Sequence, residues 1–209
     1  MAEIIPAINV ETFEDIRGRI KKIETLTEWV HIDVADGTLT PNTIWHNASD
    51  LLGIATPLKI EVHLMLGDID ARYQEWLLPN VARLVVHLEA SKDSSSLIDK
   101  IKEAGKEVVI GIMPETHWEK TKPFWGEADG ILLLSVPPGY AGQKMHDNTI
   151  EKIKGLHEAC PSCILEVDGG VHADTIKNLM EAGASRFAAA SAIWKEENIE
   201  NAIGKLKNF

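Results

Sequence analysis

This sequence has no long apolar run and too few basic residues to balance its acidic ones. No stretch approaches the roughly 20 apolar residues that cross a bilayer, so we expect no membrane-spanning segment. Lysine and arginine number 21 against 32 aspartates and glutamates, a formal net charge of −11. Nucleic acids and anionic membranes bind clustered basic side chains, so this charge argues against both as partners. It leaves room for a small anionic substrate, because helix N-termini and metal ions create local positive fields.

Cysteine is scarce, with two residues in the run Cys160-Pro161-Ser162-Cys163. This spacing occurs in redox motifs and as half of a zinc site. Thioredoxin-like pairs lie where a helix starts, whereas this pair is predicted where a helix ends and a strand begins. No second pair is present to complete four zinc ligands. We therefore expect two reduced cysteines in a connecting loop.

Targeting and linker signals are also missing. Residues 1–6 lack the basic segment and apolar stretch of a secretion signal, so a cytoplasmic protein is the default expectation. The 209 residues suit one domain with a large core, and no low-complexity tract divides them. We expect a single domain over residues 1–209.

Short apolar runs alternate with amphipathic helical patterns along the whole chain. Residues Phe13, Ile16, Ile20 and Ile23 recur at helical spacing, for example. The runs show little polar alternation, as expected of parallel strands covered on both faces. The expected strands are residues 4–8, 29–34, 58–64, 83–87, 107–112, 130–136, 164–167 and 186–189.

Eight such units in about 200 residues predict an α/β fold, a (β/α)8 TIM barrel. The alternative is a doubly wound open sheet, which usually carries a glycine-rich phosphate turn after its first strand. The first strand here ends in Pro6-Ala7-Ile8-Asn9, which has no such turn. In a barrel the active site lies at the C-terminal ends of the strands. The polar residues expected there are His31, Asp33, His63, His87, Ser135 and Asp168.

Four of these residues, His31, Asp33, His63 and Asp168, have the chemistry of one divalent-metal site. His31 and Asp33 are two apart on one strand, so their side chains project to the same face. Two imidazoles with two carboxylates suit Zn(II), Fe(II), Mn(II) or Co(II) better than Ca(II) or Mg(II). A single His or Asp at a strand end more often has a structural or capping role, and it is the set of four that favours a metal or substrate site.

Neighbouring polar residues have weaker support. His87 and Glu89 lack the support that the four ligands have. His87 ends the fourth expected strand and faces the pocket or has a structural hydrogen-bonding role, of which we favour the second. Asp36 is interpreted as a turn former or as a residue that supports the ligands from behind.

Five segments in order along the chain carry a resemblance to one family. They are residues 31–37 (HIDVADG, followed by Pro41-Asn42), 61–65 (EVHLM), 135–143 (SVPPGYAGQ), 166–171 (EVDGGV) and the block from 181–184 (EAGA) to 191–194 (SAIW). Together they resemble the ribulose-phosphate 3-epimerase family from the first strand to the last helix. Members of that family interconvert D-ribulose 5-phosphate and D-xylulose 5-phosphate by inverting carbon 3.

The resemblance implies roles for specific residues. His31, Asp33, His63 and Asp168 match the family's metal ligands one for one. Asp33 and Asp168 also match its two proton-transfer carboxylates. Dimers or larger rings are implied by resemblance alone. The tryptophans that could anchor such an interface or instead pack in the helix layer are Trp45, Trp76, Trp118, Trp125 and Trp194.

A phosphorylated sugar also needs an anion site, and we expect backbone amides rather than lysine or arginine to supply it. Gly169 and Gly170 follow the seventh strand, while Ala190 and Ser191 open the helix after the eighth, the usual phosphate position in such barrels. Gly139 and Gly142 mark a loop after the sixth strand that we expect to fold over the substrate and exclude water. An ordinary glycine-rich turn is the alternative for both pairs.

The sequence departs from its family where the family contacts substrate. Ala7 replaces a serine in the first-strand pattern P-S-I-L, Ala35 and Leu134 replace methionines, and Pro137 stiffens the entry to the loop. In the phosphate loop, Ala190 replaces a glycine, which adds a methyl group near the anion.

These departures leave the ligand set whole and change the walls of the pocket, so more than one ketose phosphate fits the sequence as a substrate. A pentulose phosphate is the first expectation. A hexulose 6-phosphate epimerised at carbon 3, or a barrel that binds a metabolite without turnover, are the alternatives. A lyase or decarboxylase is disfavoured, because those reactions usually centre on a lysine, and no strand end offers an obvious one.

Overall fold

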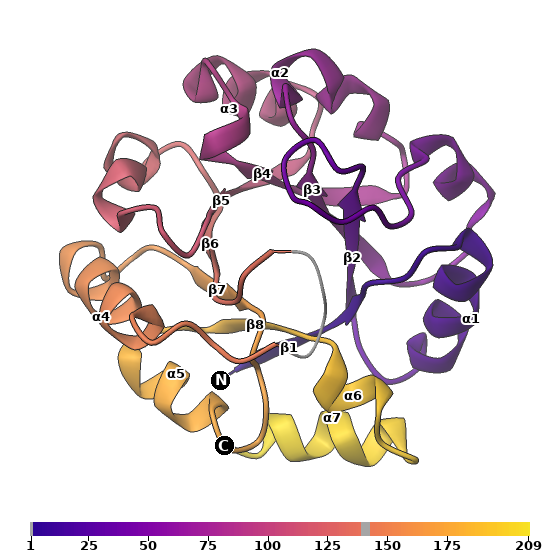
Figure 1. Cartoon of the computed structure of the whole chain (residues 1–209). Helices are drawn as coiled ribbons and strands as arrows, with labels where there is room; N and C mark the ends of the chain where they lie inside the picture. The colour runs from indigo at the N-terminus through magenta and orange to yellow at the C-terminus, as the bar shows by residue number, and fades with distance from the viewer. Residues whose placement is uncertain (1, 139–142) are drawn as a thin grey trace.

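The computed structural model describes residues 2–138 and 143–209 and shows eight parallel strands closed into a barrel inside a ring of helices (Figure 1). Each strand pairs with the next along the chain, and β1 pairs with β8. The strands are β1 (Glu3–Ile8), β2 (Trp29–Ala35), β3 (Lys59–Met65), β4 (Val81–His87), β5 (Glu107–Ile112), β6 (Gly130–Leu134), β7 (Leu165–Asp168) and β8 (Arg186–Ala189). The predicted TIM barrel is confirmed, and the open sheet is excluded.

The strands are buried along almost their whole length, which explains why their sequences alternate so little. All seven residues of β2 are buried, for example, because barrel side chains cover one face and helices cover the other. The predicted strand limits differ by a few residues from the observed ones. β6 ends at Leu134 rather than at Val136, because its last paired residue is Leu134, which lies opposite Asp168 at the end of β7.

The outer layer is less regular than eight helices would be. The helices are α1 (Phe13–Ile23), α2 (Ile69–Arg72), α3 (Ser94–Glu103), α4 (Thr149–Ala159), α5 (Ile176–Ala182), α6 (Ser191–Trp194) and α7 (Ile199–Lys207). The 3-10 helices are η1 (Ala48–Gly53), η2 (Tyr73–Trp76), η3 (Leu88–Ala90) and η4 (Trp118–Phe124). Two connections, β2 to β3 and β5 to β6, therefore contain 3-10 turns in place of an α-helix. No helix among the described residues is long and apolar enough to cross a membrane.

The longer helices follow the predicted pattern. In α1, Thr12 caps the first turn by accepting a hydrogen bond from the N–H of Asp15, and Ile16, Ile20 and Ile23 face the strands. Trp45 and Trp76 pack edge to face inside the helix layer, with ring centroids 5.8 Å apart. Packing in the helix layer thus accounts for these two tryptophans without an interface.

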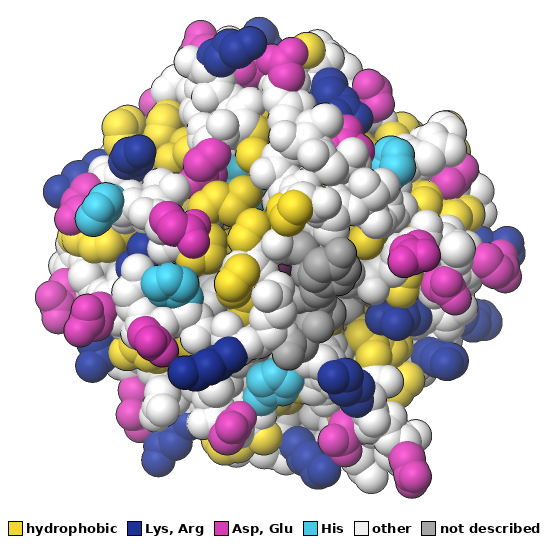
Figure 2. Space-filling model, in the orientation of Figure 1, with side chains coloured by type: hydrophobic (Ala, Val, Ile, Leu, Met, Phe, Trp, Pro, Cys, Tyr) yellow, Lys and Arg dark blue, Asp and Glu magenta, His cyan; other side chains and the backbone are white. Residues whose placement is uncertain are grey.

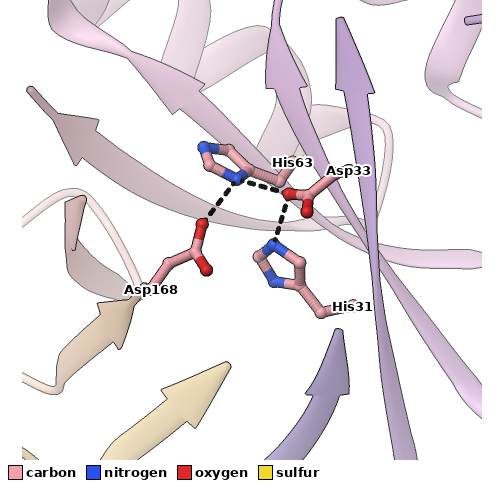
Figure 3. A group of neighbouring side chains, drawn as sticks. All are labelled: His31, Asp33, His63 and Asp168. Atoms are coloured by element: carbon pink, nitrogen blue, oxygen red, sulfur yellow. Dashed lines mark hydrogen bonds and ion pairs between the residues drawn. The ribbon is translucent and has the colours of Figure 1, made fainter. Parts of the chain in front are cut away.

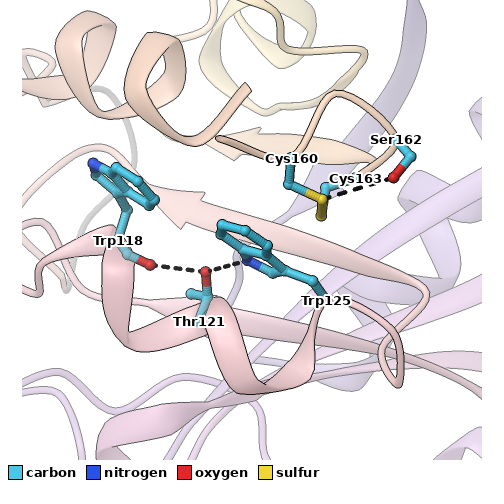
Figure 4. Close-up of a disulfide and its surroundings, with 6 residues drawn as sticks. All are labelled: Trp118, Thr121, Trp125, Cys160, Ser162 and Cys163. Atoms are coloured by element: carbon cyan, nitrogen blue, oxygen red, sulfur yellow. Dashed lines mark hydrogen bonds between the residues drawn. A yellow bond between two sulfur atoms is a disulfide. The ribbon is translucent and has the colours of Figure 1, made fainter. Parts of the chain in front are cut away.

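The prediction of two reduced cysteines is wrong, because Cys160 and Cys163 form a disulfide (Figure 4). At the end of α4 the N–H of Cys160 bonds to Leu156, and the N–H of Cys163 turns back to the carbonyl oxygen of Cys160. This tight turn brings the two Cα atoms to 5.4 Å, a separation that a disulfide spans without strain. The pair joins α4 to the start of β7, so it lies at the end of the barrel opposite to the C-terminal ends of the strands.

Candidate active site

Strands β2, β3 and β7 bring the four predicted ligands to one point (Figure 3). The register pairs Asp33 on β2 with His63 on β3, so both side chains enter the barrel at one level. Nδ1 of His63 lies 3.1 Å from Oδ1 of Asp33 and 3.3 Å from Oδ2 of Asp168. Nε2 of His31 lies 3.2 Å from the same Oδ1 of Asp33. Two imidazoles and two carboxylates therefore converge, as the sequence predicts.

The spacing of these donor atoms fits a transition-metal ion. Four atoms at about 2.0–2.1 Å from a tetrahedral ion lie about 3.3 Å from one another. One ligand atom from each of His31, Asp33, His63 and Asp168 lies within 4.8 Å of all the others, and the three closest pairs are separated by 3.1–3.3 Å. A mixed nitrogen and oxygen donor set of this kind suits zinc, iron, manganese or cobalt.

The charges of the cluster also favour a cation. Burial alone would lower the pKa of His63, but the hydrogen bonds that it donates to Asp168 and Asp33 outweigh this effect and raise that pKa to about 9. Burial would raise the pKa of Asp33, yet the two imidazoles hold it below its usual range. Positive charge is thus strongly stabilised between the two carboxylates, whether protons or a metal ion supply it.

A hydrogen bond behind His31 orients its ring. Nδ1 of His31 lies 2.6 Å from Oε1 of Glu61, and Glu61 is in turn held by Nη1 of Arg83 at 2.7 Å. A carboxylate can only accept, so Nδ1 of His31 donates to Glu61. Nε2, which faces Asp33, is therefore the nitrogen whose lone pair would be available to a bound cation.

Asn9 is a site residue that the sequence analysis missed. It follows β1, and its Nδ2 donates to Oδ2 of Asp33 at 3.0 Å, the oxygen that does not face the imidazoles. Asn9 also lines the cavity above the cluster. The sequence did carry a signal for this residue. Asn9 lies two residues after Ala7, so both side chains project to the same face, and the family pattern P-S-I-L has leucine at the position of Asn9.

A cavity at the mouth of the barrel joins the carboxylates to the predicted phosphate residues. No Lys or Arg belongs to its wall in the described part of the chain, and most basic side chains on this face lie away from its centre (Figure 2). The wall is formed by Asn9, Asp33, Met65, Leu134, Val136, Pro138, Asp168, Gly169, Gly170, Val171, Ala188, Ala190 and Ser191.

Two glycines shape the end of this cavity. Gly169 and Gly170 have φ of +97° and +62°, which glycine adopts at little cost. A Cβ on Gly169 would lie 2.6 Å from Val136, so the backbone approaches closely here. Ser191 begins α6 beside them, and its Oγ lies 3.5 Å from Nε2 of His172. The other predicted loop residues, Gly139 and Gly142, lie outside the described residues.

The departures from the family pattern fall into two groups. Leu134 and Ala190 line the cavity. Ala7 is buried and does not line it, and Ala35 is enclosed in a small apolar cluster with Ile44 and Met65. Of the five departures, Leu134 and Ala190 therefore change the cavity wall directly, whereas Ala7, Ala35 and the exposed Pro137 do not line it.

Two further predicted residues have structural contacts. Oδ1 of Asp36 accepts the N–H of Thr38 at 3.0 Å, and Oδ2 pairs with Arg72, as a turn former would. Oγ of Ser135 donates to the carbonyl oxygen of Asp168 at 2.9 Å, which ties the end of β6 to the end of β7.

Comparison with known proteins identifies the family that this chain resembles. The profile of the ribulose-phosphate 3 epimerase family matches residues 3–194. A ribulose-phosphate 3-epimerase of Bacillus subtilis is 30% identical over 214 residues, covering 99% of each chain. One of Chlamydia muridarum is 35% identical over 177 residues, covering 81% of this chain and 78% of the relative.

Solved structures agree on the fold. A 3-hexulose-6-phosphate synthase from Salmonella typhimurium superposes with a TM-score of 0.74 at 18% identity, covering 98% of this chain and 96% of that one. At that identity the likeness shows the barrel alone. The family match and the curated relatives carry the assignment: the chain belongs to the ribulose-phosphate 3-epimerase family, and so to the epimerases among the isomerases.

Proposed function

We propose that the protein inverts carbon 3 of D-ribulose 5-phosphate to give D-xylulose 5-phosphate, and the reverse. The observation that carries this proposal is the meeting of Asp33 and Asp168 in one cavity, on either side of His63 (Figure 3). Inversion requires a proton to leave one face of a planar intermediate and another to arrive on the opposite face. Two carboxylates on separate strands, β2 and β7, suit that task.

The donor set would hold one divalent transition metal through Nε2 of His31, Oδ1 of Asp33, Nδ1 of His63 and Oδ2 of Asp168. When bound, Zn(II), Fe(II), Mn(II) or Co(II) supplies positive charge that stabilises developing negative charge on neighbouring oxygens.

The chain's own residues would move the protons. Asp33 and Asp168 act in turn as base and acid, one for each face of the sugar, so one is protonated while the other is ionised. Asn9 holds the second oxygen of Asp33 in place, which fixes the direction of its lone pairs. Positioned groups of this kind contribute ~10²–10⁴-fold to a rate.

The phosphate would lie at the other end of the cavity. Backbone N–H groups around Gly169, Gly170, Ala190 and Ser191 are the proposed contacts, because no basic side chain lines the described wall. Gly139 and Gly142 are proposed to belong to a loop that closes over the bound sugar. Partners other than a small phosphorylated sugar are not expected, apart from further copies of this chain.

A hexulose 6-phosphate is the second candidate substrate, because Leu134 and Ala190 alter the cavity wall itself. A panel of ketose phosphates assayed for deuterium uptake at carbon 3 distinguishes the two. We expect the pentulose phosphates to exchange fastest, after metal addition to chelator-treated protein. Exchange that survives both Asp33→Asn and Asp168→Asn would rule out the two-carboxylate mechanism, and binding without any exchange would support a non-catalytic barrel.

A further inference from the structure

A chain of three side chains leads from His63 to the rim of the barrel. Nε2 of His63 lies 2.8 Å from Nε2 of His87, and Nδ1 of His87 lies 3.3 Å from Oε2 of Glu89. The two rings are stacked, with centroids 5.0 Å apart and planes 23° from parallel. Both histidines are fully buried, whereas a quarter of the Glu89 side chain is exposed.

Glu89 determines which nitrogen donates and which accepts in the series Glu89, His87, His63. Its Oε1 accepts from the N–H of Met113 at 3.0 Å and from the hydroxyl of Thr116. Burial raises its pKa, but hydrogen bonds from His87 and Thr116 outweigh that effect and bring the pKa to about 2. An ionised carboxylate only accepts, so His87 donates through Nδ1–H. The other nitrogen of a neutral His87 then accepts, and His63 must donate through Nε2–H.

We propose that Glu89 is a positioning residue, which acts through His87 to hold a proton on Nε2 of His63 and so reserve Nδ1, the nitrogen that faces Asp33 and Asp168, for a metal ion. A bound cation would replace the proton on Nδ1, and the neutral imidazole would then keep its one N–H at Nε2. The inference rests on the proposed metal site. It assigns a function to two residues that the sequence analysis left outside the metal site.

An independent observation is the glycine beneath the His87 ring. Gly111 on β5 pairs with His87 in the strand register. A Cβ at this position would lie 3.1–3.2 Å from Nε2, Cδ2 and Cε1 of that ring. Glycine weakens a strand interior and commonly marks a close approach. Here it leaves the space in which the His87 ring can lie between His63 and Glu89.

Glu89→Gln tests the proposal, because it preserves shape and reverses the proton order. The contacts with Met113 and Thr116 require an acceptor, so the amide oxygen takes their side and the amide NH2 faces Nδ1 of His87. His87 then donates through Nε2–H, and the proton of His63 moves to Nδ1, where it competes with the metal. We expect affinity for Co(II), measured by visible spectroscopy with chelator competition, to fall at least tenfold while thermal unfolding changes little.

The matched control is Glu3→Gln, the same carboxylate-to-amide change in the ion pair with Arg186 at the other end of the barrel. Its Co(II) affinity is expected to equal that of the unmodified protein. Gly111→Ala is a second variant, which displaces the His87 ring without removing a polar group and is expected to weaken binding too. Nitrogen-15 NMR of the zinc-loaded protein should show the proton of His87 on Nδ1.

The outcomes distinguish a failure of the proposed metal site from a failure of the positioning role of Glu89. An unmodified protein that binds no Co(II) overturns the proposed metal site and this inference with it. An unmodified protein that binds, combined with a Glu89→Gln variant of equal affinity or a His87 protonated on Nε2, overturns the positioning role alone.

Discussion

The barrel contains two buried polar layers, and they are organised in opposite ways. At the mouth, His31, Asp33, His63 and Asp168 point at one another around a common centre. Below them, each basic group already has an acidic partner. The pairs in this lower layer are Arg83 with Glu61, Arg83 with Glu107, and Arg186 with Glu3.

One carboxylate of the lower layer, that of Glu166, lacks a basic side chain within hydrogen-bonding distance in the described part of the chain. Glu166 is fully buried, and neither of its oxygens has a hydrogen-bond partner among the described residues. Burial and the nearby charge of Glu61 raise its pKa to about 7. A proton can thus neutralise this carboxylate, which lies 3.6 Å from Nδ1 of His31, beyond hydrogen-bonding distance. The comparison teaches that the charges of the lower layer are largely paired within it, whereas the side chains at the mouth converge on one centre, as the proposed metal site requires.

The largest effect is expected from Asp168→Asn at the mouth. The amide cannot carry a proton to or from carbon 3, so kcat should fall by about 10²-fold or more. The side chain is partly exposed, so the free energy of unfolding should change by about 1 kcal/mol or less. Steady-state kinetics and denaturant unfolding measure the two quantities. Since Asp33 remains, deuterium exchange should persist with one epimer and be lost with the other; equal loss with both would contradict separate faces.

In the lower layer, the largest loss of stability is expected from Arg83→Met. Arg83 is 1% exposed and its guanidinium lies 3.8 Å from the centroid of the Trp29 ring, so methionine fills the space but leaves the buried Glu61 without its guanidinium partner and with His31 alone. Breaking one side of a buried pair costs about 3–5 kcal/mol. Urea unfolding measures the loss. Glu107→Gln is the control, because nearly half of the Glu107 side chain is exposed and its contact with Arg83 should contribute under about 1 kcal/mol.

The disulfide offers a third location, outside both layers. Replacing Cys160 and Cys163 by serine removes a crosslink that closes a very short loop, worth roughly 2 kcal/mol on chain-entropy grounds. The cysteines lie at the far end of the barrel, so kcat/KM should stay unchanged. A loss of activity at a temperature where the variant is folded would show that α4 and β7 transmit changes to Asp168.

The sequence predicted the barrel well because strand burial has a simple periodic signature. It also predicted that His31, Asp33, His63 and Asp168 come together, since residues two apart on one strand share a face and strand ends meet at the barrel mouth. Two features lay beyond such patterns. The contact of Asn9 with Asp33 depends on a side-chain rotamer, and the direction of the chain from Glu89 to His63 depends on where Met113 and Thr116 donate. The disulfide was missed because spacing alone does not reveal how tightly the chain turns after α4.

The smallest effect concerns Asn9, which distinguishes positioning at the mouth from the proton transfer itself. Asn9→Leu introduces the residue of the family pattern and removes one hydrogen bond to Oδ2 of Asp33. A bond to a charged group contributes about 1.5 kcal/mol or somewhat more, so kcat/KM should fall roughly tenfold. The additional variant Ala7→Ser in this background places a hydroxyl on the same strand face. Recovery of kcat/KM in the double variant would show that either side chain can supply the polar contact. An unchanged kcat/KM in Asn9→Leu would instead show that the imidazoles alone orient Asp33.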